Sequence, residues 1–319
     1  MGEMTPMTTQ HRGLFAIPVT PFTDTGAFDE ASLRSTLAFC LEAGTHGIVT
    51  PVNASEFSTL TTEERHTVNR ATVEEISRAG KKGIVPAVIG VCAETTAEAV
   101  AYARHARDTG ADAVISMPAY QEPTDEAHIF DFYVALAEGA GLPIYIQNHE
   151  KTNGIGHPMS ADFIVRLCRE IELVQYIKEE SQNTGFKISH TIAHAGEHCR
   201  GIMGGKAGRY LFDEVRRGAC GTMPACESAD VHSQVWNLID AGDLSGAREL
   251  FNDLLPLLNI EAAFGTAIYK EVLYRRRIIA SPYKRLPGLT LDAHDHEELE
   301  LILNALSPHF TVRTPVTRP

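Results

Sequence analysis

The amino-acid sequence predicts an α/β fold, namely a (β/α)8 TIM barrel with additional C-terminal helices. Short runs of β-branched residues alternate with helix-length amphipathic segments from about residue 13 onward, and turn residues occupy the joints. Strands that alternate with helices pair in parallel through right-handed crossovers, and eight such units close into a barrel. We expect a single domain over residues 1–319, with the barrel at about 12–225 and a helical extension at about 228–319.

Eight runs have the length and the apolar composition of buried strands. They lie at 14–19, 47–50, 84–89, 112–116, 143–147, 173–178, 200–203 and 219–222. Helices are expected between them at about 29–43, 61–79, 95–109, 125–139, 160–170, 183–195 and 208–217. No low-complexity linker interrupts this alternation, which favours one domain.

Capping signals predict where two of these helices begin. Thr61 is followed three residues later by Glu64, and Thr95 is followed in the same way by Glu98. In such a capping box the hydroxyl and the carboxylate each accept a hydrogen bond from a backbone N–H at the helix start. We therefore expect helices to begin directly after Thr61 and Thr95.

The chain beyond about residue 228 has a different pattern. Its periodicity is helical, with breaks at Gly242 and Gly265 and another helix near 293–305. We expect these helices to be appended to the barrel.

The composition indicates a globular protein with an acidic surface. Hydrophobic residues make up 44% of the chain and charged residues 22%, and no apolar run is long enough to span a membrane. A formal net charge of −13 disfavours nucleic acid and anionic lipid as partners. Six cysteines without a CxxC pair, and an N-terminus without an apolar signal segment, predict a cytoplasmic protein with reduced thiols.

The segment LVQYIKEES, residues 173–181, ends an apolar strand on a lysine that is followed by two glutamates. Catalytic groups of a barrel lie at the C-terminal ends of its strands, which is where Lys178 is expected. Burial lowers the pKa of an amine, and a neutral amine can attack a carbonyl. The alternative is an ammonium group that pairs with Glu179 or Glu180 at a solvated strand end.

Two loops at the same end of the expected barrel carry further candidates. After the second strand, Asn53 and Ser55 together with backbone N–H groups provide neutral donors for a substrate carboxylate. The alternative is a turn that caps the next helix, and Glu56 is expected to fix this loop. After the fourth strand, Tyr120 in a proline-flanked loop either presents its phenol to the pocket or packs against its neighbours.

The chain resembles the dihydrodipicolinate synthase/N-acetylneuraminate lyase family in several features that occur in a fixed order over about residues 12–305. These are the barrel layout, the strand-two loop that ends in Glu56, the P-x-Y loop with Tyr120, the strand-six sequence IKE and the appended helices. The resemblance implies a class I lyase in which Lys178 forms an imine and the 53–56 loop binds the carboxylate of an α-keto acid. It also implies a homotetramer, in which Tyr120 reaches toward the site of a neighbouring subunit.

Two departures from the family pattern narrow the chemistry. The chain has NAS at 53–55 where synthases and aldolases carry Thr-Thr-Gly or Ser-Thr-Gly, and Gln147 stands where the family has the catalytic tyrosine of strand five. Retro-aldol cleavage needs a group that relays the proton of the C4 hydroxyl, and an amide does not do this. We therefore expect proton abstraction at C3 and loss of a β-leaving group, with Glu180 either as the base or as the ion-pair partner of Lys178.

The pattern also resembles the branch of this family that contains 2-keto-3-deoxy-L-arabonate dehydratase. The favoured function is dehydration of this or a similar 2-keto-3-deoxy sugar acid to a semialdehyde, with Gln147 or Tyr120 assisting departure of the C4 hydroxyl. The imine itself serves as the electron sink, so no metal or organic cofactor is expected. Lys206 and Glu227 either line the pocket or are ordinary loop charges.

Three alternatives to the dehydratase stay open at this point. A deaminating lyase that acts on hydroxy-pyrroline-carboxylate would use the same imine, and so would a retro-aldolase that releases pyruvate. An inactive barrel that acts as a sensor is the alternative outside catalysis.

One motif points to another class of enzyme. HAGEH, residues 194–198, has the H-x-x-E-H spacing of inverted zinc peptidases, which places two histidines on one helical face. Gly196 disfavours a continuous helix there by about 1 kcal/mol relative to alanine. A polar helix terminus, on a face remote from Lys178, explains the motif better.

Overall fold

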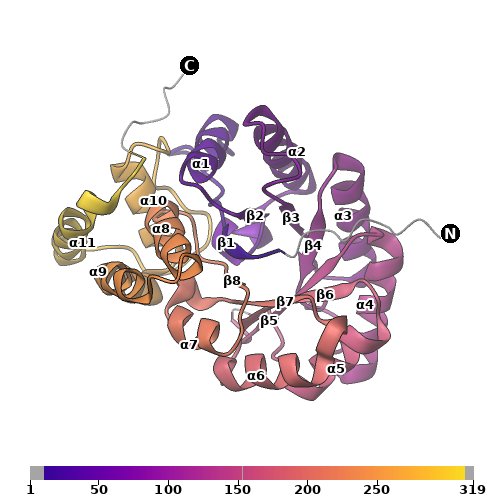
Figure 1. Ribbon diagram of the computed structural model, residues 1–319. Helices are drawn as coiled ribbons and strands as arrows, with labels where there is room; N and C mark the ends of the chain where they lie inside the picture. The colour runs from indigo at the N-terminus through magenta and orange to yellow at the C-terminus, as the bar shows by residue number, and fades with distance from the viewer. Residues whose placement is uncertain (1–10, 153, 313–319) are drawn as a thin grey trace.

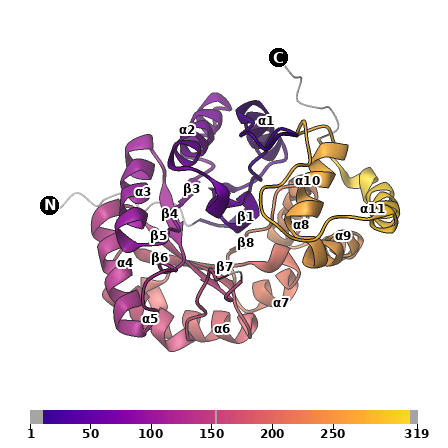
Figure 2. The same ribbon diagram turned by 180° about the vertical axis from the view of Figure 1, so that it is seen from behind.

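The computed structural model describes residues 11–152 and 154–312, and within them a closed barrel of parallel strands is surrounded by helices (Figures 1 and 2). Its strands are β1 (Gly13–Ala16), β2 (Gly47–Thr50), β3 (Ala87–Gly90), β4 (Ala113–Ser116), β5 (Ile144–His149), β6 (Val174–Glu180), β7 (Gly201–Gly204) and β8 (Gly221–Thr222). Each strand pairs with the next one along the chain, and β8 pairs with β1 to close the barrel. The predicted (β/α)8 barrel is confirmed.

Helices follow the strands around the barrel. They are α1 (Glu30–Glu42), α2 (Thr62–Arg78), α3 (Thr96–Thr109), α4 (Glu126–Ala140), α5 (Ala161–Glu170), α6 (Thr184–Ala195), α7 (Leu211–Arg216) and α8 (Ala229–Asp240). The chain then forms α9 (Leu244–Phe264), α10 (Thr266–Arg275) and α11 (Ala293–Leu306), which gather beside α8 on one side of the barrel (Figure 1). The predicted breaks at Gly242 and Gly265 fall between α8, α9 and α10 and are confirmed.

Both predicted capping boxes form. The hydroxyl of Thr61 accepts a hydrogen bond of 3.2 Å from the N–H of Glu64, whose carboxylate accepts one of 2.9 Å from the N–H of Thr61. Thr95 and Glu98 repeat this arrangement at 3.3 and 3.2 Å. Two otherwise unsatisfied backbone donors are thereby paired at the start of α2 and of α3.

Aromatic rings close the N-terminal end of the barrel. Tyr145 of β5 and Tyr176 of β6 stack with ring centroids 4.5 Å apart. His11 stacks on Tyr176 at 5.0 Å and forms a hydrogen bond of 2.6 Å with the Tyr145 hydroxyl. Because these rings fill the interior at this end, open space inside the barrel lies toward the C-terminal ends of the strands.

The sixth strand is longer than the sequence predicts. The predicted end at Lys178 is wrong, because β6 continues to Glu180 and pairs with β5 through two further residue pairs, Asn148↔Glu179 and His149↔Glu180. The two glutamates after Lys178 do not end the strand, because Glu179 is buried and accepts hydrogen bonds from its neighbours. Lys178 therefore lies two residues inside a strand instead of at its edge.

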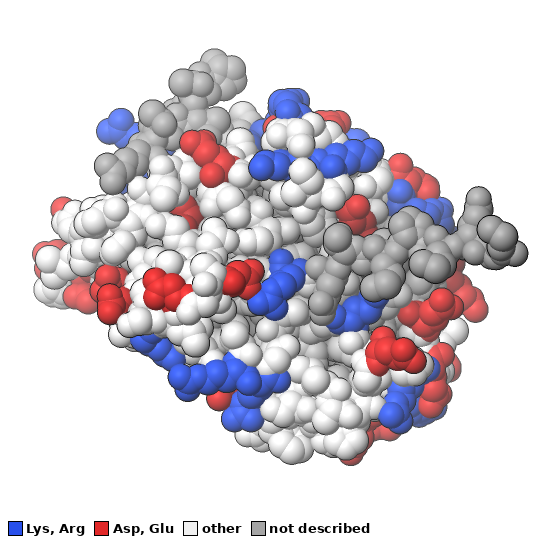
Figure 3. All heavy atoms as spheres, viewed as in Figure 1, with Lys and Arg blue, Asp and Glu red and all other residues white. Residues whose placement is uncertain are grey.

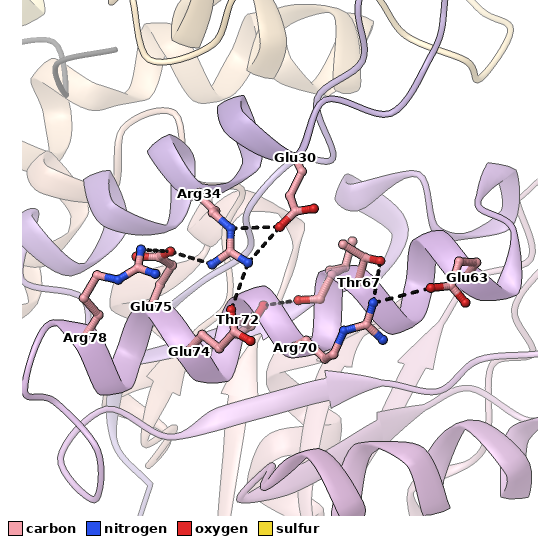
Figure 4. A network of polar contacts seen from close by, with 10 residues as sticks. Glu30, Arg34, Glu63, Thr67, Arg70, Thr72, Glu74, Glu75 and Arg78 are labelled. Carbon is pink, nitrogen blue, oxygen red and sulfur yellow. Dashed lines mark hydrogen bonds and ion pairs between the residues drawn. The ribbon is translucent and has the colours of Figure 1, made fainter. Parts of the chain in front are cut away.

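On the outside of the barrel, an arginine links the first two helices (Figure 4). Arg34 of α1 donates hydrogen bonds of 2.9 Å to Glu30, 2.8 Å to Glu74 and 2.8 Å to Glu75, and the last two belong to α2. This network holds α1 against α2 and lies outside the barrel interior.

The surface carries charges of both signs. Figure 3 shows lysine, arginine, aspartate and glutamate side chains distributed over one face. In the part of the chain that the structure describes, no helix combines the length and the apolar composition needed to cross a membrane.

A buried carboxyl group lies behind β7. Glu214 of α7 is 1% exposed, and none of the described residues donates a hydrogen bond to its two oxygens. Gly204 leaves the room for it, because a side chain on Gly204 would collide with this carboxyl. Burial, followed by the charges of Asp213 and Glu179, raises the pKa of Glu214 to about 8.

Glu214 therefore predicts a pH-dependent stability. Between its ordinary pKa of 4.5 and about 8, the folded chain keeps a proton that the unfolded chain has lost. The free energy of unfolding should then fall as the pH rises through this window, by about 1.4 kcal/mol per pH unit at most. Glu214→Gln should remove this slope, so that the variant unfolds at higher urea concentration than the wild type at pH 8 but not at pH 5.

Urea unfolding between pH 5 and 9 measures this difference. The exposed Glu249 of α9 provides a matched control, because Glu249→Gln should leave the pH profile unchanged. Parallel profiles for Glu214→Gln and the wild type would show that Glu214 is not the titrating group.

Candidate active site

A cavity of about 360 Å³ opens at the C-terminal ends of the strands. Its polar lining includes His149, Lys178, Glu180, Lys206, Arg209 and Glu261. Larger hollows, of about 840, 710, 510 and 410 Å³, lie against α10 and α11, around the N-terminal ends of the strands, at the loop after α10 and beside the end of α5. None of these contains a residue that the sequence predicts for the lyase site, so the cavity at the C-terminal ends of the strands is the candidate active site.

Lys178, Glu180 and Gln147 form a hydrogen-bonded group in this cavity. The Nζ atom of Lys178 lies 3.0 Å from Oε1 of Glu180, and Nε2 of Gln147 donates a hydrogen bond of 2.7 Å to the same oxygen. Lys178 is 3% and Glu180 is 7% exposed, so little water screens the two groups from each other. An amine and a carboxylate at this separation can exchange a proton and act on adjacent carbon atoms of one substrate.

Strand geometry explains why these side chains meet. Successive side chains of a strand point to opposite faces, so Gln147 and His149 share one face of β5, and Lys178 and Glu180 share one face of β6. The two strands pair with Gln147 opposite Lys178 and His149 opposite Glu180. Four polar side chains are therefore placed on the same face of the barrel wall, in two residue pairs that are separated by the pair Asn148↔Glu179.

Glu180 is a carboxylate in this setting. Burial by itself would raise its pKa, but the charges of Lys178 and His149 and the hydrogen bond from Gln147 outweigh burial and hold the pKa below the ordinary glutamate value. The second oxygen accepts a hydrogen bond of 3.4 Å from the backbone N–H of Lys206. Glu180 is thus ionised at neutral pH and is able to accept a proton.

Glu179 faces away from the lysine. Its carboxylate accepts hydrogen bonds of 2.7 Å from the Asn148 amide and 2.5 Å from the Ser181 hydroxyl, and Lys187 donates one of 2.5 Å to that hydroxyl. Of the two glutamates proposed to pair with Lys178, it is Glu180 that does so. The Glu179 network fixes the end of β6 from the outside of the barrel.

The loop after β2 contributes one side of the cavity. It contains two short 3-10 helices, η1 (Asn53–Ser55) and η2 (Phe57–Thr59), and Asn53 lines the cavity. Ser55 is fully buried, where its hydroxyl donates a hydrogen bond of 2.6 Å to the carbonyl of Pro18 and lies 3.2 Å from the Thr50 hydroxyl. The cavity wall therefore contains Asn53 but not the side chain of Ser55.

Glu56 points away from the cavity. Its backbone has the left-handed conformation, with φ of 54°, and its carboxylate is fully buried against the Nζ atom of Lys270 in α10. The other oxygen accepts hydrogen bonds of 2.8 and 2.7 Å from the backbone N–H groups of Arg285 and Leu286. Burial lowers the pKa of Lys270 to about 8, although Glu56 opposes this shift. Glu56 thus attaches the strand-two loop to the C-terminal part of the chain.

Tyr120 lies outside the cavity wall. It is half-buried in a small apolar cluster with Phe57, Cys92 and Met117, and its ring meets that of Phe57 edge-on at 6.4 Å. Burial raises the pKa of its hydroxyl. Within the described chain, Tyr120 packs against its neighbours and does not present its phenol to the cavity.

The two remaining candidates lie in or behind the wall. Lys206 belongs to the 3-10 helix η4 (Lys206–Gly208) after β7 and lines the cavity, where its Nζ donates a hydrogen bond of 3.2 Å to the Ser181 carbonyl. Glu227 follows β8 and is fully buried, within hydrogen-bonding reach of the Glu261 carboxyl.

Several lining residues were not predicted from the sequence. His149 has a signal that was available, because it follows Gln147 by two residues and so shares its face of β5. Arg209 lies in the loop after the Gly-rich end of β7, and its place at the catalytic end of the barrel was a weaker signal. Glu261 of α9 and Tyr269 of α10 come from helices outside the barrel, and only the folded chain brings them to the cavity.

The HAGEH motif spans a helix end. Helix α6 ends at Ala195, Gly196 has φ of 57°, and a separate 3-10 helix, η3 (Gly196–His198), follows. His194 and His198 therefore do not share one face of a continuous helix. Among residues 11–152 and 154–312, no group of three or more histidine, cysteine, aspartate or glutamate side chains is arranged to hold a metal ion.

Comparisons with known proteins agree on one family. The family model described as "Dihydrodipicolinate synthetase family" matches residues 10–306. The chain is 30% identical over 305 residues to L-2-keto-3-deoxyarabonate dehydratase of Azospirillum brasilense, which covers 94% of this chain and 96% of that protein. It is 27% identical over 299 residues to 4-hydroxy-tetrahydrodipicolinate synthase of Methanothrix thermoacetophila, with coverage of 93% and 97%. The solved structure of dihydrodipicolinate synthase from Acinetobacter baumannii, complexed with pyruvate, matches with a TM-score of 0.82 at 25% identity, over 94% of this chain and 99% of that chain.

Proposed function

Because this chain belongs to the dihydrodipicolinate synthetase family, whose members are Schiff-base-forming class I lyases, we propose that it is a hydro-lyase that acts on a small 2-keto-3-deoxy sugar acid. The favoured substrate is 2-keto-3-deoxy-L-arabonate or a similar acid, and the product is a semialdehyde. One observation carries the proposal: the amide of Gln147 donates to Glu180 beside Lys178, at the place where an aldolase needs a proton relay. The similarity to the dehydratase of Azospirillum brasilense supports it.

In the proposed mechanism, Lys178 attacks C2 of the keto acid as a neutral amine, and loss of water gives an iminium ion. Glu180 is placed to take the proton that the Lys178 ammonium gives up, since the two groups are 3.0 Å apart. Asn53 and backbone N–H groups of its loop orient the C1 carboxylate, and the buried Ser55 holds that loop in place. The iminium draws electrons from C2 and acidifies the C3–H bond.

The next step is elimination of the C4 hydroxyl, for which Glu180 beside Lys178 is the proposed base. Glu180, or a water that it holds, removes the C3 proton and returns it to the C4 hydroxyl, which the resulting enamine expels as water, with Gln147 donating a hydrogen bond to the departing oxygen. A proton then shifts from C5 to C4, the C5 hydroxyl loses its proton to give the aldehyde, C3 gains one proton, and hydrolysis of the imine frees Lys178. The iminium supplies the electron sink throughout, so the mechanism uses no other cofactor.

We further propose that the substrate is a small-molecule α-keto acid and that the protein is cytoplasmic and forms a homotetramer. The homotetramer is the assembly in which Tyr120 would reach a neighbouring subunit's site. A deaminase, a retro-aldolase and an inactive sensor are outcomes that the following experiment distinguishes.

Incubation of the purified protein with 2-keto-3-deoxy-L-arabonate is expected to yield a semialdehyde that an added dehydrogenase oxidises to α-ketoglutarate. Pyruvate as the product would identify a retro-aldolase, because it requires carbon–carbon cleavage. Ammonia released from hydroxy-pyrroline-carboxylate would identify the deaminase. An absence of product from both compounds, with intact binding of pyruvate, would overturn the proposal in favour of a sensor.

A further inference from the structure

A carboxyl group that no mechanism step uses faces the cavity from outside the barrel. Glu261 of α9 lines the same cavity as Lys178 and is only 2% exposed. Apart from the carboxyl of Glu227, no group of the described chain lies within hydrogen-bonding reach of its two oxygens. A buried polar group without a donor destabilises the fold unless a ligand or a water satisfies it. The position of Glu261 in the wall of a cavity therefore indicates a ligand group.

A second carboxyl lies behind Glu261. Glu227 is fully buried and within hydrogen-bonding reach of Glu261, and its Oε2 has no donor among the residues that the structure describes. Two carboxylates this close do not both ionise, so the pair holds a proton. Burial and the neighbouring Glu227 raise the pKa of Glu261 well above its ordinary value, although the charge of Arg209 opposes this shift. The two carboxyls therefore share this proton, and the oxygens that do not hold it lack a donor among the described residues.

The surroundings favour a neutral hydroxyl group as the partner of these oxygens. Tyr269 of α10 lines the same part of the wall, and burial raises the pKa of its hydroxyl, which stays protonated. Arg209 is engaged by a hydrogen bond of 3.1 Å from its Nε to the Lys206 carbonyl. The remaining negative charge of the carboxyl pair would repel a second acid group, whereas a hydroxyl can both donate to the pair and accept from it.

We propose that Glu261, supported by Glu227, binds the terminal hydroxyl of the substrate and thereby selects keto acids with a hydroxylated, uncharged end opposite the carboxylate. This inference rests on the proposed function, because it places C2 of the substrate at Lys178. A small acid held at C2 leaves its remaining carbon atoms to extend through a cavity of about 360 Å³. A site built to bind a hydroxyl discriminates strongly against an analogue that lacks it, because its buried polar groups are then left unpaired.

Two substitutions of Glu261 test this inference. Glu261→Met removes the carboxyl at similar volume and should fold, because it takes away buried oxygens that no described donor satisfies. Glu261→Gln retains a donor beside Glu227. We expect Glu261→Met to raise KM for 2-keto-3-deoxy-L-arabonate about tenfold or more, and Glu261→Gln to change it less than about threefold.

Pyruvate provides the internal control, because it has no terminal hydroxyl. The pyruvate concentration that half-saturates borohydride trapping should stay within about twofold of the wild-type value in both variants. Competition with 2-oxo-4-hydroxypentanoate, which lacks only the terminal hydroxyl, gives the matched comparison. The wild type should prefer the hydroxylated acid about tenfold, and Glu261→Met should lose this preference.

The outcomes separate this inference from the proposed function. A wild type that forms the semialdehyde, together with a Glu261→Met variant of unchanged preference, would overturn the role of Glu261 alone. A wild type that traps pyruvate but forms no semialdehyde would overturn the proposed function. An equal loss of pyruvate trapping and of substrate binding in Glu261→Met would show a structural role for Glu261 and would also contradict the inference.

Discussion

Replacing Lys178 by arginine is expected to abolish both the lyase activity and the covalent trapping of pyruvate. Arginine retains a positive charge beside Glu180, but a guanidinium group does not form the imine that the mechanism requires. Loss of a nucleophile that carries the covalent intermediate lowers kcat by on the order of 10⁴-fold or more. Mass spectrometry after borohydride reduction with pyruvate measures the adduct directly, on the peptide that contains Lys178.

The other lysine of the cavity wall supplies the control for this result. Lys206 donates a hydrogen bond to the Ser181 carbonyl, and Lys206→Arg preserves that donor and its charge. We expect Lys206→Arg to trap pyruvate as the wild type does. An adduct that survives in Lys178→Arg, or one that maps to Lys206 in the wild type, would refute the assignment of the imine to Lys178.

Replacing Glu180 by glutamine is expected to separate imine formation from proton abstraction. Glutamine has nearly the same shape as glutamate, so the cavity should keep its volume, but its amide does not accept a proton. Loss of a general base lowers kcat by about 10²- to 10⁴-fold. Trapping of pyruvate at Lys178 should persist in Glu180→Gln, although more slowly, since the nucleophile remains in place but has to give up its proton to water.

Deuterium exchange measures the missing step without any sugar acid. An enzyme that forms the pyruvate imine and removes a C3 proton exchanges the methyl protons of pyruvate in heavy water, which NMR detects. Wild type should exchange them, and Glu180→Gln should bind pyruvate without exchange. Because the pKa of Glu180 lies below its ordinary value, the base is ionised at pH 5 and above, and exchange by the wild type should not be limited by this group there.

Glu179 provides the matched control for Glu180. It is the adjacent residue and is also buried, but its carboxylate is bound by Asn148 and Ser181 on the outer face of β6. Glu179→Gln should therefore retain exchange, even if it lowers the stability of the fold. Exchange at the wild-type rate in Glu180→Gln would assign the base to another group, of which His149, 4.0 Å from Glu180, is the nearest titratable candidate on β5.

Local patterns in the sequence accounted for most of the fold. Capping boxes at Thr61 and Thr95 marked helix starts because they depend only on residues three positions apart. The apolar runs marked the strands, and the motifs indicated a family that the comparisons confirm. The end of β6 was placed two residues early, because the partners that bury Glu179 lie on β5 and in the following loop and are not evident in the run itself.

Strand periodicity and the resemblance to the family were the two guides to residues of the candidate site that the sequence offered. Lys178 and Glu180 were identified from their positions in one strand, and Gln147 from the resemblance to the family. The periodicity argument applied to β5 would have added His149. The direction of Glu56 depends on its left-handed backbone and on Lys270, more than two hundred residues away in the chain. Glu261 depends on how α9 packs, which no local pattern in the sequence expresses.

The buried ion pair of Glu56 and Lys270 limits which segments of related enzymes can be combined in one chimeric chain. It joins the loop that carries Asn53 to α10, and the backbone of Arg285 and Leu286 binds the same carboxylate. A chimera that takes its C-terminal helices from a relative without the matching loop would leave a charge buried and unpaired, at a cost of about 3 to 5 kcal/mol. The strand-two loop and the C-terminal helices therefore have to be exchanged together in such a chimera.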